Sequence, residues 1–79
     1  MTDHRPEKRS LTLKGHRTSV SLERDFWDAF RDIAAARQQP INALASEIDE
    51  SRGGDIGLAS AIRLFVLRHY RDRSSTPED

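Results

Sequence analysis

A short polar and basic pattern at Arg17, Ser19 and Ser21 is the part of the chain best suited to recognising another molecule. These residues alternate with β-branched and apolar ones at positions 18, 20 and 22. Alternate side chains of a β-strand lie on opposite faces. Arginine can donate two hydrogen bonds to a guanine edge, and serine hydroxyls can bond several bases. A strand with this outward face therefore suits the major groove of DNA, although a plain solvent-facing surface would show the same pattern.

The strand over residues 16–22 has no second strand of comparable quality to pair with in the same chain. Because its backbone groups need hydrogen-bond partners, we expect the partner strand to come from a second copy. The two strands would form an antiparallel ribbon that exposes six polar or basic side chains, three from each chain. Gly15 marks a turn or a close backbone approach where this ribbon begins.

Length and charge fit this arrangement. The chain of 79 residues forms at most one small domain, for which dimerisation is a common source of stability. Its net charge is zero, but residues 1–17 hold five Lys and Arg against two acids, so this segment carries +3 and the rest −3. The positive charge lies beside the expected ribbon. A solvated basic tail accounts for it equally well.

Several classes of protein are disfavoured by composition. The absence of cysteine excludes disulfides and thiolate metal sites, and the histidines lack partners at ligand spacing, so we expect no metal. We also find no glycine-rich phosphate loop or nucleophile set, and we expect neither an enzyme nor a cofactor. The longest apolar run, residues 64–67, is too short to span a membrane, and the first residues do not resemble a signal peptide. We therefore expect a cytoplasmic protein.

The remaining chain predicts helices. Apolar residues recur at helical spacing over residues 24–37, 42–50 and 58–71, and Asn42 is a strong N-cap candidate for the second helix. Residues 1–13 are expected to be a flexible basic arm, residues 14–71 the folded domain, and residues 72–79 a disordered tail. The predicted fold is mainly α with one N-terminal strand, in the order β-α-α-α.

This order of elements resembles the ribbon-helix-helix family of DNA-binding proteins, and more narrowly a bacterial subgroup with an additional C-terminal helix. The resemblance covers residues 14–70. The residues that carry it are Gly15-His16-Arg17-Thr18-Ser19-Val20-Ser21-Leu22-Glu23, Phe26-Trp27, Ile33, Pro40-Ile41-Asn42-Ala43-Leu44, Glu47-Ile48-Asp49 and Ala61-Ile62-Arg63-Leu64-Phe65-Val66. Many members of the family end after two helices, so the third helix has no assigned role.

The resemblance implies an intertwined homodimer whose two-stranded intermolecular antiparallel sheet enters the major groove. Matching positions would make Arg17, Ser19 and Ser21 the base-reading residues. Asn42 and the backbone amides of Ala43 and Leu44 would bind a phosphate at a helix N-terminus. Lys14 and His16, beside the ribbon, are further phosphate candidates. We expect the dimer core to contain Val20, Leu22, Phe26, Phe30, Ile33, Leu44, Ile48, Ile62, Phe65 and Val66.

Two functions compete at this point. The first is a bacterial transcriptional regulator, a repressor or autoregulator, that binds double-stranded DNA as a homodimer and can assemble further on adjacent half-sites. The second is a protein-interaction module or an antitoxin-type protein that binds a protein partner through the same fold. Zero net charge and the apolar third helix favour the second, whereas the outward face of the strand favours the first.

Overall fold

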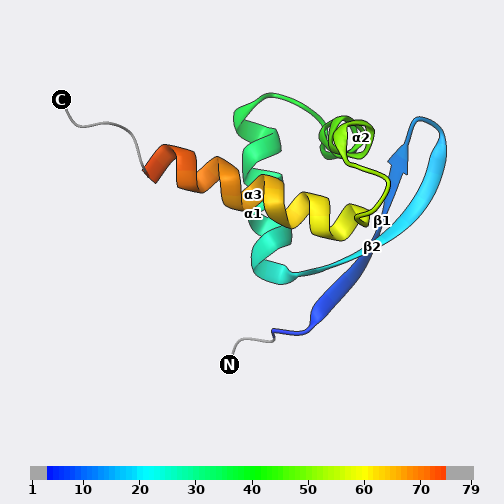
Figure 1. Ribbon diagram of the computed structural model, residues 1–79, viewed down its shortest axis with the longest axis horizontal. Helices are drawn as coiled ribbons and strands as arrows, with labels where there is room; N and C mark the ends of the chain where they lie inside the picture. The colour runs from blue at the N-terminus through cyan, green and yellow to red at the C-terminus, as the bar shows by residue number, and fades with distance from the viewer. Residues whose placement is uncertain (1–3, 75–79) are drawn as a thin grey trace.

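The computed structural model describes residues 4–74, which form two antiparallel strands followed by three helices (Figure 1). The elements are β1 (Pro6–Leu13), β2 (His16–Glu23), α1 (Arg24–Ala36), α2 (Ile41–Ser51) and α3 (Leu58–Ser74). The mainly helical class is confirmed. The number of strands is two rather than the predicted one.

Strand β1 lies where we predicted a flexible arm over residues 1–13, so that prediction is wrong for residues 6–13; residues 1–3 lie outside the described part. The strands pair along their whole length, from Pro6 opposite Glu23 to Leu13 opposite His16. The connecting residues Lys14 and Gly15 have φ values of 52° and 85°, positive at both positions as a type I′ turn requires. Within the described chain β2 therefore pairs with β1, and the expected pairing between two chains stays a prediction, because the structure describes a single chain.

Two charged residues on the inward face of β1 explain why its alternation was missed. Arg9 donates a hydrogen bond to Glu7 at 2.9 Å, and its guanidinium carbon lies 5.1 Å from the centre of the Trp27 ring. The Trp27 indole N–H donates to the backbone carbonyl of Glu7 at 2.9 Å. Long charged side chains can cover apolar surface with their stems. Glu7 and Arg9 thus occupy inward-facing positions, at which apolar residues would have indicated a strand in the sequence.

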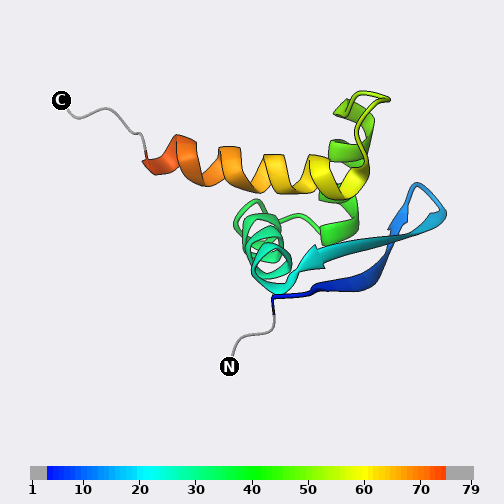
Figure 2. The same ribbon diagram turned by 60° about the horizontal axis from the view of Figure 1, so that its bottom comes forward.

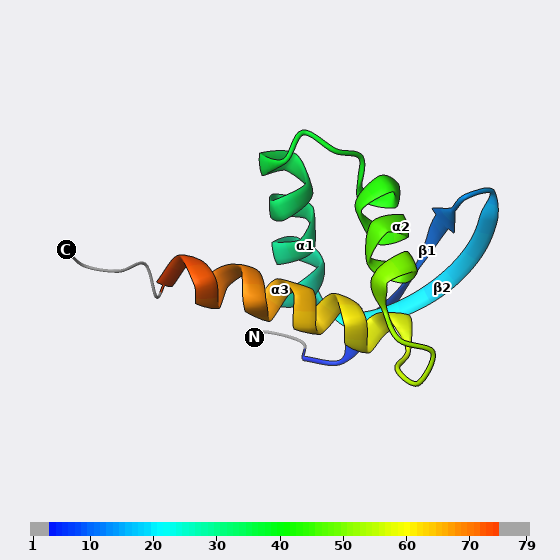
Figure 3. The same ribbon diagram turned by 45° about the horizontal axis from the view of Figure 1, so that its top comes forward.

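Helices α1 and α2 lie side by side, and α3 crosses both of them (Figure 3). Helix α1 ends where Gln38 adopts a positive φ of 56°. Pro40, not Asn42, is the N-cap of α2, so the predicted capping role of Asn42 is wrong. Helix α3 continues to Ser74, which corrects the predicted disordered tail for residues 72–74; residues 75–79 lie outside the described part.

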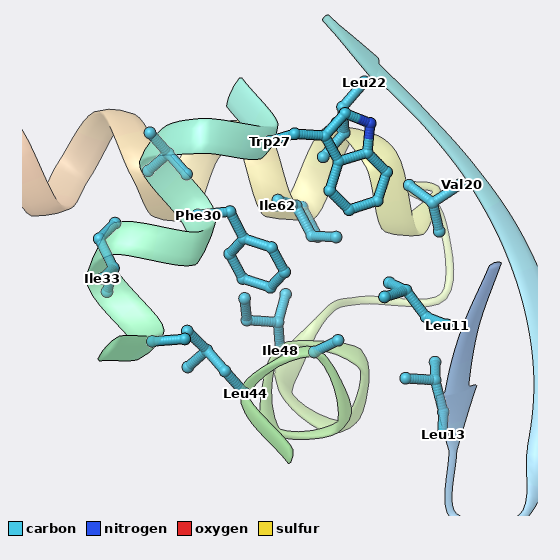
Figure 4. Packing of buried hydrophobic residues seen from close by; sticks show 14 residues of the cluster. Leu11, Leu13, Val20, Leu22, Trp27, Phe30, Ile33, Leu44, Ile48 and Ile62 are labelled. Carbon is cyan, nitrogen blue, oxygen red and sulfur yellow. The ribbon is translucent and has the colours of Figure 1, made fainter. Parts of the chain in front are cut away.

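The hydrophobic core joins the inner face of the hairpin to all three helices within a single chain (Figure 4). Eight of the ten residues that we assigned to a dimer core are buried here, and Phe26 and Phe65 pack against them while partly buried. Their assignment to a dimer core stays a prediction, because the structure describes a single chain. The buried hydrophobic residues are Leu11, Leu13, Val20, Leu22, Trp27, Phe30, Ile33, Ala34, Leu44, Ala45, Ile48, Ala61, Ile62 and Val66.

Candidate nucleic-acid interface

The hairpin has one face buried against the helices and one face open to solvent. Directly opposed residues of an antiparallel pair share a face, and the register places Lys8 opposite Ser21, Ser10 opposite Ser19, and Thr12 opposite Arg17. All six side chains are exposed. The hairpin also reaches out beyond the helices, so that its turn forms one end of the molecule (Figure 2). We call this surface the outer face; it consists of Lys8, Ser10, Thr12, Arg17, Ser19 and Ser21.

The chemistry of the outer face is uniform. The six side chains are two cations and four hydroxyls, and the next pair on the same face is Pro6 with Glu23, an acid that is paired with Arg63. Within residues 4–74, the side chains of Lys8 and Arg17 form no ion pair or hydrogen bond. Hydroxyls donate to and accept from base edges, while cations attract phosphates and guanine acceptors. The outer face is therefore equipped for hydrogen bonding to an anionic polymer.

The predicted base-reading residues Arg17, Ser19 and Ser21 lie together on the outer face, where they are exposed. Sequence reasoning missed the contribution of β1, which adds Lys8 and the hydroxyls of Ser10 and Thr12. The sequence nevertheless contains a pattern that indicates this strand. A two-residue connection ending in glycine, with alternating residues on both sides, is typical of a β-hairpin.

Strand β2 is fixed to α3 by Arg63. The Arg63 guanidinium donates to the two Glu23 carboxylate oxygens at 3.0 and 3.1 Å, and to the Ser21 backbone carbonyl at 3.5 Å. Hydrogen bonds from the Glu23 backbone amide and from Arg63 lower the pKa of the Glu23 carboxyl below its ordinary value of 4.5. This acid therefore stays ionised at neutral pH. The contact holds the end of the outer face in place.

Strand β1 is fixed to α2 by Asn42. The side-chain oxygen of Asn42, a residue in the first turn of α2, accepts a hydrogen bond from the Thr12 backbone amide at 3.1 Å. With the Trp27 contact to Glu7, β1 is tied to the helices near both of its ends. The outer face thus rests on a hairpin whose two strands are each held by side chains from the helices.

The predicted phosphate-binding residues at the start of α2 are already engaged. The backbone amides of Ala43 and Leu44 donate to the Pro40 carbonyl at 3.0 and 3.2 Å, and the Asn42 side chain holds β1. These contacts are made within the chain, and the assignment of the three residues as phosphate ligands stays a prediction. Of the other two phosphate candidates, Lys14 forms an ion pair with Glu50 and His16 is exposed beside the turn.

Residues 4–74 show neither a membrane-spanning helix nor a cluster of metal ligands. In that range no helix has both the length and the apolar character that a membrane span requires. The same range contains no group of three or more His, Cys, Asp or Glu residues placed to hold a metal ion.

Comparison with known proteins places the fold in a family. The family model described as a ribbon-helix-helix domain matches residues 6–70. A solved structure, that of an uncharacterized protein from Bordetella pertussis Tohama I, is similar to this chain with a TM-score of 0.74 and 33% identity. The similarity covers 96% of this chain and 66% of that one. No curated protein matches. The chain belongs to the ribbon-helix-helix family, whose fold is that of DNA-binding regulators.

Proposed function

We propose that this protein is a sequence-specific transcriptional regulator, a repressor or autoregulator in a bacterium, that reads the major groove of DNA with the outward face of a dimeric β-ribbon. In this proposal Arg17 contacts a guanine edge, and Ser19 and Ser21 bond neighbouring bases. Lys14 and His16, beside the turn, approach the phosphates. Membership of a family of DNA-binding regulators supports the proposal.

The single observation that carries the proposal is the composition of the outer face. Six exposed side chains from two strands are all hydroxyl or cationic, whereas the opposite face of the same hairpin supplies the core residues Leu11, Val20 and Leu22. A two-stranded ribbon fits the width of the major groove. Cations without partners inside the described chain favour binding to a polyanion.

We further propose that the protein acts as a homodimer, the arrangement expected from the family. Two hairpins related by a two-fold axis would contact two half-sites of a palindromic operator.

The proposed function is tested by selection from a labelled pool of genomic DNA fragments at several salt concentrations. We expect the native protein to enrich a few fragments, with binding that weakens as salt rises. The variant Arg17→Ala should lose about 1–3 kcal/mol of specific binding. Arg68→Ala, which removes an exposed arginine from α3, is the matched control. Absence of binding by the native protein at low salt would refute the proposal.

One observation supports the second function, a protein-interaction module or antitoxin. Helix α3 exposes three large hydrophobic residues, Leu64, Leu67 and Tyr70, by 39%, 52% and 41%. Exposed apolar groups of this kind often mark protein-binding surfaces. Affinity purification with and without nuclease treatment separates the two functions. Recovery of one protein partner without nucleic acid would favour the second function.

A further inference from the structure

We infer that helix α3 carries a second binding surface, which takes an acidic amphipathic helix of another protein. This surface, which we call the α3 surface, consists of Leu64, Leu67 and Arg68 together with a groove between α3 and the end of α2. The inference goes beyond the reading of DNA, because α3 contributes no residue to the outer face. It gives the third helix a role and its partner a chemistry.

The apolar part of the α3 surface is exposed and runs into the groove. Leu64 and Leu67 are 39% and 52% exposed, and their spacing of three residues places them side by side on the helix. The groove has a volume of about 540 Å³, and Leu64 is one of its lining residues. Its other apolar lining residues are Ile48, Ile56, Ala61 and Phe65. Apolar side chains of a partner that cover these groups would remove them from water, which is favourable.

Positive charge accompanies the apolar residues. Helix α3 contains four arginines and one aspartate, so its formal charge is +3. Arg68 lines the groove one helical turn after Leu64, and its side chain forms no ion pair or hydrogen bond within residues 4–74. The aspartate, Asp72, already interacts within the chain. A partner that supplies carboxylates beside its apolar residues would therefore complement this surface.

The same distribution disfavours a second copy of this chain as the occupant. The exposed large hydrophobic residues within residues 4–74 are Leu64, Leu67 and Tyr70, all of which lie on α3. A second copy could cover the leucines with large apolar groups only by presenting its own α3, and a charge of +3 would then face +3. Residues 75–79 of the sequence supply two acids but no large hydrophobic side chain. The acids and the apolar groups must therefore come together from a different protein.

The leucines also distinguish the α3 surface from a DNA-binding one. Phosphates would match the arginines of α3, but they offer nothing to cover Leu64 and Leu67. An amphipathic helix satisfies both requirements, because its apolar side enters a groove while its polar side carries charge. A groove between two helices is a common binding site for such a helix. The chemistry of the α3 surface therefore favours a protein partner over a nucleic acid.

The test is selection of helical peptides from a random displayed library on the native protein, followed by affinity measurement with the selected peptides. We expect these peptides to carry large apolar residues at helical spacing, flanked by Asp or Glu. Leu64→Gln/Leu67→Gln and Arg68→Glu should each weaken binding roughly tenfold. Arg24→Glu, which reverses an exposed arginine of α1, is the matched control and should bind as the native protein does.

The outcomes separate this inference from the proposed function. Selection of no peptide, selection of basic peptides, or equal binding by Leu64→Gln/Leu67→Gln would refute it. Association of the native protein with itself that is lost in Leu64→Gln/Leu67→Gln, measured by sedimentation, would identify a second copy as the occupant instead. Arg17→Ala should lose DNA binding while its affinity for the selected peptides is unchanged, so failure of either function leaves the other standing. Circular dichroism confirms that each variant is folded.

Discussion

At the scale of single residues, Asn42 illustrates what local sequence rules can and cannot predict. Its type and position after Pro40 indicate an N-cap, a role that depends only on neighbours in the chain. In the structure its side chain instead accepts a hydrogen bond from Thr12, a residue 30 positions away. No local pattern contains that partner. The exposure of Arg17, Ser19 and Ser21 was predictable, because strand alternation alone decides it.

The Asn42 contact leads to a stability prediction. Asn42→Ala removes the acceptor of the Thr12 amide, and we expect the free energy of unfolding to fall by about 1 kcal/mol. Asn42→Asp keeps an acceptor, and its charge is favourable near a helix N-terminus, so its stability should match the native protein. Urea denaturation measures both, with Ser60→Ala as the surface control. Equal stability of Asn42→Ala and the native protein would contradict the assigned role.

At the scale of elements, strand β1 is the main difference between prediction and structure. The three helices were predicted because their apolar residues recur at helical spacing and their ends are marked by Pro40 and by Gly53 with Gly54. The alternation of β1 was obscured because Glu7 and Arg9 lie on its inward face. Both residues are only partly buried there and contact Trp27, a residue that the sequence of the strand does not reveal.

An engineered disulfide between the two strands tests whether β1 and β2 pair within one chain. The Thr12 amide donates to Asn42, so Thr12 and the opposite residue Arg17 do not hydrogen-bond each other. Hydrogen-bonded and non-hydrogen-bonded pairs alternate along an antiparallel ladder, so Ser10 and Ser19 are also a non-hydrogen-bonded pair. Their Cα atoms should lie about 4.5 Å apart, within reach of a disulfide. The native chain has no cysteine. Oxidised Ser10→Cys/Ser19→Cys should therefore run as a monomer on a non-reducing denaturing gel.

The control for this test is the single variant Ser10→Cys, which cannot close a bond within one chain. A covalent dimer of the double variant, beyond the small amount formed by the single variant, would show that β1 pairs with β2 of another chain. That result would restore the intermolecular sheet expected from sequence.

At the scale of the whole molecule, the structure separates two roles between two faces of one hairpin. The inner face completes a core with α1, α2 and α3, and the outer face carries only cations and hydroxyls. Removing an outer-face side chain should therefore change binding without changing the core. The sequence could predict most core residues because they follow helical or strand spacing. It could not show that one chain suffices to bury them, since this depends on β1.

The measurement that tests the central claim most directly is a titration of the isotope-labelled protein with an operator fragment, followed by NMR of the backbone amides. We predict that the largest chemical-shift changes occur at the outer-face residues of both strands, while Leu64, Leu67 and Tyr70 of α3 change little. Changes that cluster on α3 and leave the hairpin unaffected would contradict the claim that the hairpin is the DNA-binding surface.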